Sequence, residues 1–330
     1  MSMTARDVGT GSVAGISRRM RSWAQGIGLL WVLLILCGVA IYLSPSFLQT
    51  GNLLNVGRQV ALFGIVSVGM TFVILTRGID LSVGSIVGVA SVSAAMMLAA
   101  GVSIPVVVLA ALAIGALFGI FNGIGVVVLG MPPFIMTLGT LVMGRGIAMT
   151  IADGQPKSLG SAAEEFHFLG GGFMLGIPVP IWIFVAIVAV AYFVLRHTAF
   201  GRQVYAVGSN AEAARLAGIN VPRVLMSVYV ISGLLSALTA LIFVSRLTVG
   251  EPTAGTNLEL EAISIVVIGG TSLFGGEGGV VGTVIGAAII ALMANILNLL
   301  GISPFTQQIV KGAIILAAVG FEVLRHRKGR

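Results

Sequence analysis

Residues 104–129 read IPVVVLAALAIGALFGIFNGIGVVVL, a stretch without a single charged side chain. A helix needs roughly 20 mostly apolar residues to cross a bilayer, so this stretch is long enough to span one. The whole chain of 330 residues has the same character, since 57% of it is hydrophobic and 9% is charged. Soluble domains carry about 25% charged residues, and so few charges could not cover a water-exposed surface. The sequence therefore predicts an all-α integral membrane protein.

Nine other stretches are similarly apolar, which gives about ten transmembrane helices. The first of them follows Arg18, Arg19 and Arg21 and could belong to a cleaved signal peptide. It is longer than the apolar region of such a peptide and lacks an obvious small-residue cleavage site before Pro45, so we expect it to remain as a membrane helix. The predicted spans are 26–43, 57–76, 81–100, 104–129, 131–151, 178–196, 224–246, 259–274, 279–300 and 306–324.

The Lys and Arg residues predict the orientation, because cytoplasmic loops of membrane proteins carry an excess of them. An even number of spans places both termini on one side. If that side is the cytoplasm, most of the basic residues lie inside, while Arg145 falls within a span. The net charge of +7 is then a topology signal, and no nucleic-acid partner is expected. We predict a multi-pass membrane protein with cytoplasmic tails, residues 1–25 and 325–330. The basic residues left outside or at the outer ends of spans are Arg58, Lys157, Arg246 and Lys311.

The membrane domain, residues 26–324, shows internal similarity at a spacing of 171 residues. "LGMPPF" (129–134) aligns with "LGISPF" (300–305), and Gly115–Ala116 aligns with Gly286–Ala287. This spacing maps four predicted spans onto four others, in units of about 57–151 and 228–322, with opposite orientation in the membrane. Inverted repeats are common in transporters, which place the pathway between them; chance similarity of apolar sequence is the alternative.

Glycines recur at every fourth position in two segments, which predicts helix faces where another backbone comes close. We expect them to serve helix packing and not substrate binding. They are Gly115, Gly119 and Gly123 in one segment and Gly278, Gly282 and Gly286 in the other.

Several kinds of catalytic and energy-coupling chemistry are missing from the sequence. No GxxxxGK[ST] motif occurs, so ATP binding by a P-loop is excluded. His167, His197 and His326 lack the spacing of metal ligands, and the spans hold few acidic residues of the kind that ion-coupled carriers use. We expect no enzyme activity, no metal and no cofactor on this chain. Transport energy would come from a separate subunit, or the flow would be downhill.

The longest predicted inner connection, residues 197–223, contains the signals of a short helix in "GSNAEAARLAGINVPRV" (208–224). Ser209 or Asn210 can form the N-cap, and Glu212 lies in the first turn. Arg215 is spaced to pair with Glu212, while Gly218 suits the C-terminal cap. The helix is either part of a solvated basic loop or a docking element for a cytoplasmic motor subunit. Its small apolar face consists of Ala213, Leu216 and Ala217.

The predicted outer loop, residues 152–177, is rich in glycine and carries Glu164 and Glu165. It is either a solvated cover over the helix ends or a docking surface for an extracytoplasmic partner.

Four motifs follow one another along the chain: "GIDLSVGS" (78–85), "AVGSNAEAARLAGINV" (206–221), "VVIGGTSLFGGEGGVVGTVIGA" (266–287) and "NLLGISPFTQQIVKGAIILAAV" (298–319). They resemble the permease subunits of ribose-type sugar ABC importers, in the branched-chain amino acid/ribose permease superfamily, over about residues 25–325. The resemblance implies a homodimer with a vitamin-B12-importer-like fold in a bacterial inner membrane. It also implies cytoplasmic ATPase subunits that bind ATP and Mg, and a periplasmic sugar-binding protein.

The expected function is transport of a monosaccharide or related polyol. The alternatives are a permease for branched-chain amino acids or nucleosides, an ATP-independent facilitator, and a membrane scaffold without transport. Amides and hydroxyls in the spans suit sugar hydroxyls, although they could equally form bonds between helices. The candidate pathway residues are Asn122, Thr137, Asn295, Asn298, Gln307 and Gln308.

The stretch "TRGIDLSVGS" (76–85) is predicted to be a cytoplasmic turn between two spans. Gly78 allows the reversal, and Asp80 or Ser82 can cap the next helix. Arg77 fits the positive-inside rule and is placed to pair with Asp80. The family resembled usually has Gly where this chain has Arg77, which leaves the role of this residue open.

Overall fold

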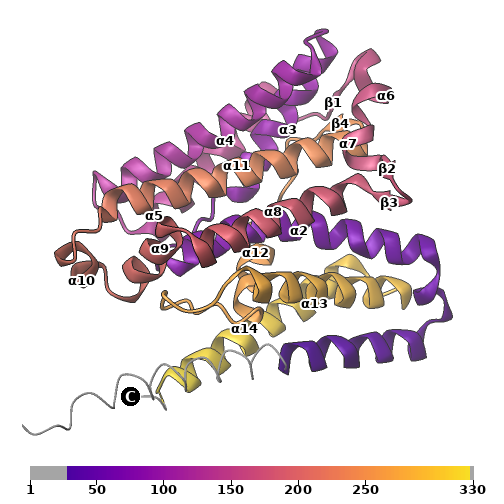
Figure 1. Cartoon of the computed structure of the whole chain (residues 1–330). Coiled ribbons are helices and arrows are strands. Elements are labelled where there is room, and N and C mark those ends of the chain that lie inside the picture. The colour runs from indigo at the N-terminus through magenta and orange to yellow at the C-terminus, as the bar shows by residue number, and fades with distance from the viewer. Residues whose placement is uncertain (1–27, 328–330) are drawn as a thin grey trace, which may run out of the picture.

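The structure, a computed structural model, describes residues 28–327, and long helices make up most of it (Figure 1). Within these residues, six helices are long and apolar enough to cross a membrane. The predicted all-α architecture is confirmed. The six helices are α2 (Thr50–Leu75), α4 (Ile104–Val127), α5 (Pro133–Ile151), α8 (Val179–His197), α11 (Val221–Leu247) and α13 (Val280–Leu299).

Further helices lie in the other predicted spans but are shorter or less apolar. Two short apolar helices cover Gly28–Leu43 and Val83–Ala99 (α3), and α14 covers Pro304–Arg327. Helix α12 (Leu258–Ile268) has only 11 residues, because the chain turns at Gly270, where φ is +82°. The predicted span 259–274 therefore ends early as a helix, and the count of ten transmembrane helices stays a prediction. The predicted tail 1–25 and residues 328–330 lie outside the described residues.

The short elements gather at two opposite ends of the helices (Figure 1). Helices α9 (Ala199–Ser209) and α10 (Ala211–Leu216) lie at one end. The other end holds two antiparallel strand pairs, β1 with β4 and β2 with β3. The helix bundle therefore has two distinct faces, as expected for a protein with an inner and an outer side. The remaining short elements are η1 (Pro45–Leu48), β1 (Lys157–Ser158), η2 (Gly160–Ala162), α6 (Ala163–Phe166), α7 (Phe168–Gly171), β2 (Phe173–Met174), β3 (Ile177–Pro178) and β4 (Val249–Gly250).

Helix α2 is the most deeply buried of the six long helices: 78% of its most apolar 18-residue stretch is buried inside the protein. Small residues on its surface let neighbours approach. A Cβ atom on Gly64 would lie 2.4 Å from the Phe184 ring of α8, and one on Gly69 would lie 3.0 Å from Ser232 Cα of α11. Helices α4, α5 and α8 are only 22–28% buried, so they form the periphery. The core of the molecule therefore lies around α2.

Glycine contacts join α4 to α11, as the spacing on α4 predicts. A Cβ on Gly115 would lie 2.2 Å from the Gly233 carbonyl oxygen, and one on Gly233 would lie 2.1 Å from the Gly115 carbonyl oxygen. Gly119 likewise faces the backbone of Tyr229. Without side chains at these positions the two backbones pack directly against each other.

The second glycine series is only partly helical. Gly282 and Gly286 of α13 face the backbone of α12, with a Cβ on Gly282 placed 1.9 Å from the Gly269 carbonyl oxygen. Gly278 lies before the first residue of α13, in a loop where its φ is +123°. Gly278 is therefore not part of a helix face, but the predicted close approach of another backbone is present, since a Cβ there would lie 2.4 Å from Thr271 Cα.

The chain enters α12 through a non-helical segment, residues 251–257, that runs beside the start of α3. A Cβ on Gly84 of α3 would lie 2.2 Å from the Gly255 carbonyl oxygen. Arg145 of α5 donates hydrogen bonds to the carbonyls of this segment, at 2.6 Å for Pro252. Irregular backbone within a bilayer needs such internal partners, so Arg145 has a structural role here.

Candidate functional site

Helix α10 has the caps that its sequence predicts. The Asn210 side chain accepts a hydrogen bond from the Ala213 amide at 3.0 Å, so Asn210 and not Ser209 forms the N-cap. At the other end, Gly218 has φ +82°, and the Ile219 amide donates to the Ala214 carbonyl at 3.0 Å. Such paired caps satisfy backbone groups that a six-residue helix would otherwise leave free.

One side of α10 is apolar and exposed, although the helix lies outside the six candidate spans. Leu216 is 80% exposed, while Ala214 is 4% exposed and faces the protein. Ala213 and Ala217 are also exposed. The Arg215 and Glu212 side chains form the predicted ion pair at 2.7 Å, but an exposed pair of this kind contributes little to stability. Helix α10 therefore offers a small apolar surface to a partner.

Helix α9, which leads into α10, was not predicted as a separate helix. The Thr198 side chain caps its start by accepting a hydrogen bond from the Gly201 amide at 3.2 Å. Val204 and Val207 are buried and hold this helix against the membrane helices. Thr198 and the three-residue spacing of the two valines are the signals that sequence reasoning missed.

The prediction that Arg77 pairs with Asp80 is wrong. Arg77 has a left-handed backbone, with φ +64°, and its side chain lies against the end of α9. Its Nε donates to the Gly208 carbonyl at 2.6 Å, and its Nη2 donates to the Ser209 carbonyl at 2.5 Å. The cause is a contact between segments far apart in the sequence, which local spacing does not reveal.

Asp80 is completely buried and lies in a network of hydroxyl groups. Its Oδ1 accepts hydrogen bonds from the Ser82 amide at 3.0 Å and the Ser82 hydroxyl at 2.6 Å. Its Oδ2 accepts a bond from the Ser232 hydroxyl of α11 at 2.7 Å. Burial raises the pKa of Asp80, while the hydrogen bonds from Ser82 and Ser232 lower it by less. The carboxyl group therefore fastens the turn to α11, and it also satisfies the free amide of Ser82, the residue that precedes the first turn of α3.

Two neighbouring polar atoms lie buried without a hydrogen-bond partner among the described residues, the Tyr229 hydroxyl and Asn122 Oδ1. A Cβ on Gly78 would lie 2.7 Å from the Tyr229 hydroxyl oxygen, so Gly78 leaves the room that this side chain occupies. Ser82 is not a side-chain cap; its hydroxyl accepts a bond from Asn122 at 2.8 Å. Sequence reasoning missed Tyr229 and Ser232, because nothing in their local sequence distinguishes them from ordinary helix residues.

The structure does not bring the six predicted pathway residues together. Asn122 belongs to the network around Asp80, and Thr137 lies nearby, with its hydroxyl 3.0 Å from the Ile79 carbonyl. The others are elsewhere: Asn295 exchanges amide hydrogen bonds with Asn52 at 2.7 and 3.1 Å, Gln307 donates to Asn298 at 2.8 Å, and Gln308 is exposed.

Two charged side chains within predicted spans are partners of each other. Glu261 of α12 and Lys311 of α14 form an ion pair. Charged residues inside a membrane are costly unless they are paired. Within residues 28–327, no group of His, Cys, Asp and Glu side chains could hold a metal ion, and the expectation of no metal stays a prediction.

Comparison with known proteins gives the family. Residues 52–319 match the family model described as the permease component of branched-chain amino acid transport systems. The chain belongs to this family.

Three relatives of this permease are import permeases for ribose. The chain is 46% identical to the ribose import permease of Haemophilus influenzae, over 87% of this chain and 90% of the relative. It is 46% identical to that of Bacillus subtilis, over 89% and 92%, and 43% identical to that of Escherichia coli K12, over 94% and 97%. No solved structure matches.

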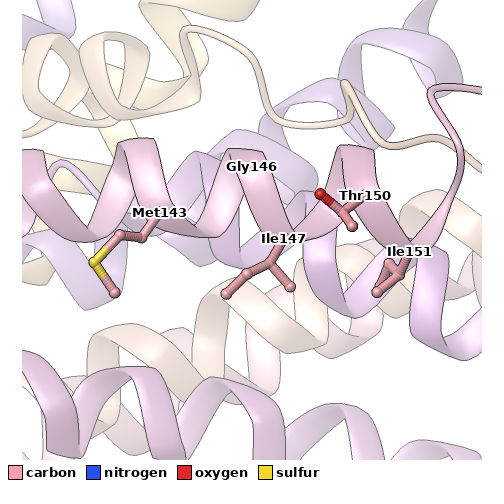
Figure 2. A pocket seen from close by; sticks show the side chains of 5 residues that line it. All are labelled: Met143, Gly146, Ile147, Thr150 and Ile151. Atoms are coloured by element: carbon pink, nitrogen blue, oxygen red, sulfur yellow. The ribbon is translucent and has the colours of Figure 1, made fainter.

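A hollow of about 450 Å³ opens along α5 of the permease, lined by Met143, Gly146, Ile147, Thr150 and Ile151 (Figure 2). All five residues come from one helix, and the Met143 and Ile147 side chains project from the same side of it (Figure 2). Thr150 supplies the one side-chain hydroxyl of the lining. None of the predicted pathway residues lines this hollow, so a single chain does not form a sugar site here.

Proposed function

We propose that this chain is the membrane-spanning permease subunit of a binding-protein-dependent ABC importer. Its cargo is ribose or a similar monosaccharide or polyol, and separate ATPase subunits that bind ATP and Mg supply the energy. The observation that carries the proposal is the exposed apolar side of α10, with Leu216 80% exposed. The ribose import permeases among the relatives support the choice of cargo.

The form of α10 fits docking onto a motor subunit. The helix is capped at both ends by residues next to it; α9 ends just before the cap at Asn210, and α11 begins at Val221 after four connecting residues. A displacement of α10 would therefore be transmitted to the membrane helices, because no long flexible loop separates them. We propose that this end of the molecule faces the cytoplasm, with both termini inside.

The inverted repeat is part of the proposal, and the helix boundaries support it. Thr50 and Val221, the first residues of α2 and α11, are 171 positions apart. Pro133 and Pro304, which begin α5 and α14, have the same spacing. So do Arg77 and Thr248, both with positive φ, +64° and +54°. In Figure 1, α2 and α11 run in opposite directions along the bundle.

Packing between the proposed repeat units is also reciprocal. Helix α11 of the second unit packs against α3 and α4 of the first. Helix α2 of the first unit packs against α12 and α13 of the second. The first helix of each proposed unit therefore packs against the second and third helices of the other unit. Two related units joined by a pseudo-twofold axis would pack in this way.

We further propose that two copies form the importer, with the translocation pathway between them and a vitamin-B12-importer-like fold. A periplasmic sugar-binding protein would dock at the end of the molecule that holds residues 152–177. This end is ordered by contacts with α11: the Ser245 hydroxyl accepts a bond from the Gly170 amide at 2.7 Å and donates one to the Phe166 carbonyl. A firm surface of this kind suits repeated docking.

Uptake by the reconstituted complex tests the proposal. The permease, its ATPase subunits and its binding protein are placed in liposomes, and accumulation of radiolabelled ribose is followed with and without ATP inside. We expect uptake only with ATP and binding protein, inhibited by unlabelled ribose and not by leucine or a nucleoside.

Uptake by the permease alone, without ATP or partners, would instead favour a facilitator. Inhibition by leucine or by a nucleoside would favour the corresponding permease.

A further inference from the structure

The carboxyl end of α9 meets the carboxyl end of α2 in direct backbone contact. Gly208 makes this contact possible, since a Cβ there would lie 1.7 Å from the Leu75 carbonyl oxygen. The same carbonyl accepts a hydrogen bond from the Gly276 amide at 2.9 Å. Three segments that are far apart in the sequence therefore meet at one carbonyl group. We name this place the α9 junction: residues 75–77, 208–209 and 275–278.

The loop that precedes α13 is held to the α9 junction by further contacts. The Tyr205 hydroxyl of α9 donates a hydrogen bond to the Gly278 carbonyl at 2.9 Å. Gly275 and Gly276 have φ of +76° and +74°, and a Cβ on Gly276 would lie 2.4 Å from the Ser209 hydroxyl oxygen. The positive φ angles of the two glycines therefore allow the backbone of this loop to pack in direct contact with α9.

Arg77 bridges the junction with its side chain. One guanidinium group binds two successive carbonyls, Gly208 and Ser209, at 2.6 and 2.5 Å. The carboxyl end of a helix carries partial negative charge, so a cation is stabilised there. A planar guanidinium can bind both carbonyls at once, whereas a lysine ammonium is a point charge on a flexible stem. The φ of +64° at Arg77 is unfavourable for a residue with a side chain, so the position is maintained against a backbone cost.

The α9 junction lies directly beside α10, the helix proposed to dock onto the ATPase. Ser209 is followed by Asn210, the N-cap of α10. From the junction, α2 leads back into the first proposed repeat unit and α13 leads into the second. We propose that Arg77 is a positioning residue that fastens α10 to both units, so that a displacement of α10 moves α2 and α13 together. This inference rests on the proposed function, because an ATPase must act on α10.

Arg77→Gly is the decisive variant, because glycine accepts the left-handed backbone and removes only the side chain. The complete complex carrying Arg77→Gly, Arg77→Lys or Arg202→Ala is reconstituted in liposomes. Ribose uptake and ATP hydrolysis are measured on the same samples, and thermal unfolding of each permease is recorded. Arg202 is the matched control, since it is an exposed arginine of the same α9 helix.

We expect Arg77→Gly to keep its unfolding temperature and ATPase activity while ribose transported per ATP falls by about fivefold or more, the range of typical coupling effects. Arg77→Lys should recover part of the loss, and Arg202→Ala should match the wild type. Unchanged ribose per ATP in Arg77→Gly, an equal loss in Arg202→Ala, or loss of the ATPase from the complex would overturn the inference. If the wild-type complex shows no ATP-dependent uptake, the proposed function itself fails.

Discussion

At the scale of single residues, Asp80 shows how a buried carboxylate is held without the arginine three positions before it. Its oxygen atoms accept three hydrogen bonds, two from Ser82 and one from Ser232. Hydroxyl and amide donors compensate for part of the lost hydration. The carboxyl group therefore joins the turn after α2 to the middle of α11, which begins more than a hundred residues later.

Replacing Asp80 tests this role. Asp80→Ala leaves three buried donors without their acceptor, and each unpartnered buried group costs about 1–3 kcal/mol. We expect the apparent unfolding temperature in detergent to fall strongly for Asp80→Ala and little for Asp80→Asn, whose oxygen still accepts bonds from Ser82. Equal losses in both variants would mean that the negative charge itself is needed. Loss of uptake by an Asp80→Asn permease that still assembles with its ATPase would show a further role.

The pH dependence of stability follows from the raised pKa of Asp80. The folded state binds the proton more tightly than the unfolded chain, whose Asp pKa is about 3.9. The resulting stabilisation is complete below that value and is lost as the pH rises through the folded-state pKa. The unfolding temperature of the wild type relative to Asp80→Asn should therefore increase as the pH is lowered toward about 4. A pH-independent difference would contradict this prediction.

At the scale of elements, α10 is short and depends on its caps. Asn210→Ala removes the acceptor for the Ala213 amide, and loss of an N-cap typically costs about 1 kcal/mol. We expect faster hydrogen exchange of the amides in residues 211–217, while α11 is unaffected. Asn210→Asp keeps the acceptor and serves as the control; if it exchanges as fast as Asn210→Ala, the cap is not the cause.

The exposed side of α10 gives a second test at this scale. Leu216→Ser should weaken retention of the ATPase during purification, because it removes most of the apolar side chain that α10 presents. Ala211→Ser changes another exposed residue of the same helix and should have little effect. Equal binding of the ATPase by wild type and Leu216→Ser would exclude Leu216 as a docking residue.

The sequence predicted those features that depend on neighbours within one turn of a helix. The cap at Asn210, the ion pair of Glu212 with Arg215 and the positive φ of Gly218 all follow from local spacing. Arg77 was assigned the wrong partner because its true partners lie more than 130 residues away. Helix α9 was missed because its two local signals, the N-cap Thr198 and the spacing of Val204 and Val207, lie in a short stretch of mixed polarity.

At the scale of the whole molecule, the close contact of α4 with α11 joins the two proposed repeat units. Gly115→Ala would place a Cβ 2.2 Å from the Gly233 carbonyl oxygen, and overpacking of this kind costs about 1–3 kcal/mol. We expect a clear fall in unfolding temperature. Gly139→Ala on α5 is the control, because no atom lies within 4 Å of the added Cβ. Similar losses for both would point to the helix backbone and not to the contact.

The repeat itself was predicted from few identities, and the boundaries of the helices now support it at several positions. Composition and span length were sufficient for the all-α membrane architecture. The packing of the first helix of each proposed unit against the other unit could not be predicted, because hydropathy shows where helices lie and not which of them touch. The residues that line the pathway could not be predicted either, because most of the polar side chains proposed for it form hydrogen bonds inside the protein.

The central position of α2 has a consequence for how the protein is made. Among the six long helices, α2 leaves the ribosome first, yet its partners α11, α12 and α13 are synthesised well over a hundred residues later. The surface of α2 that these helices cover in the folded protein therefore stays uncovered until they have been made. The core cannot close during translation of the first half, and a nascent chain that stops before Val221 has α8 but lacks three of the helices that pack against α2, namely α11, α12 and α13. Closure of the core around α2 is therefore expected only after the second half of the chain has been made.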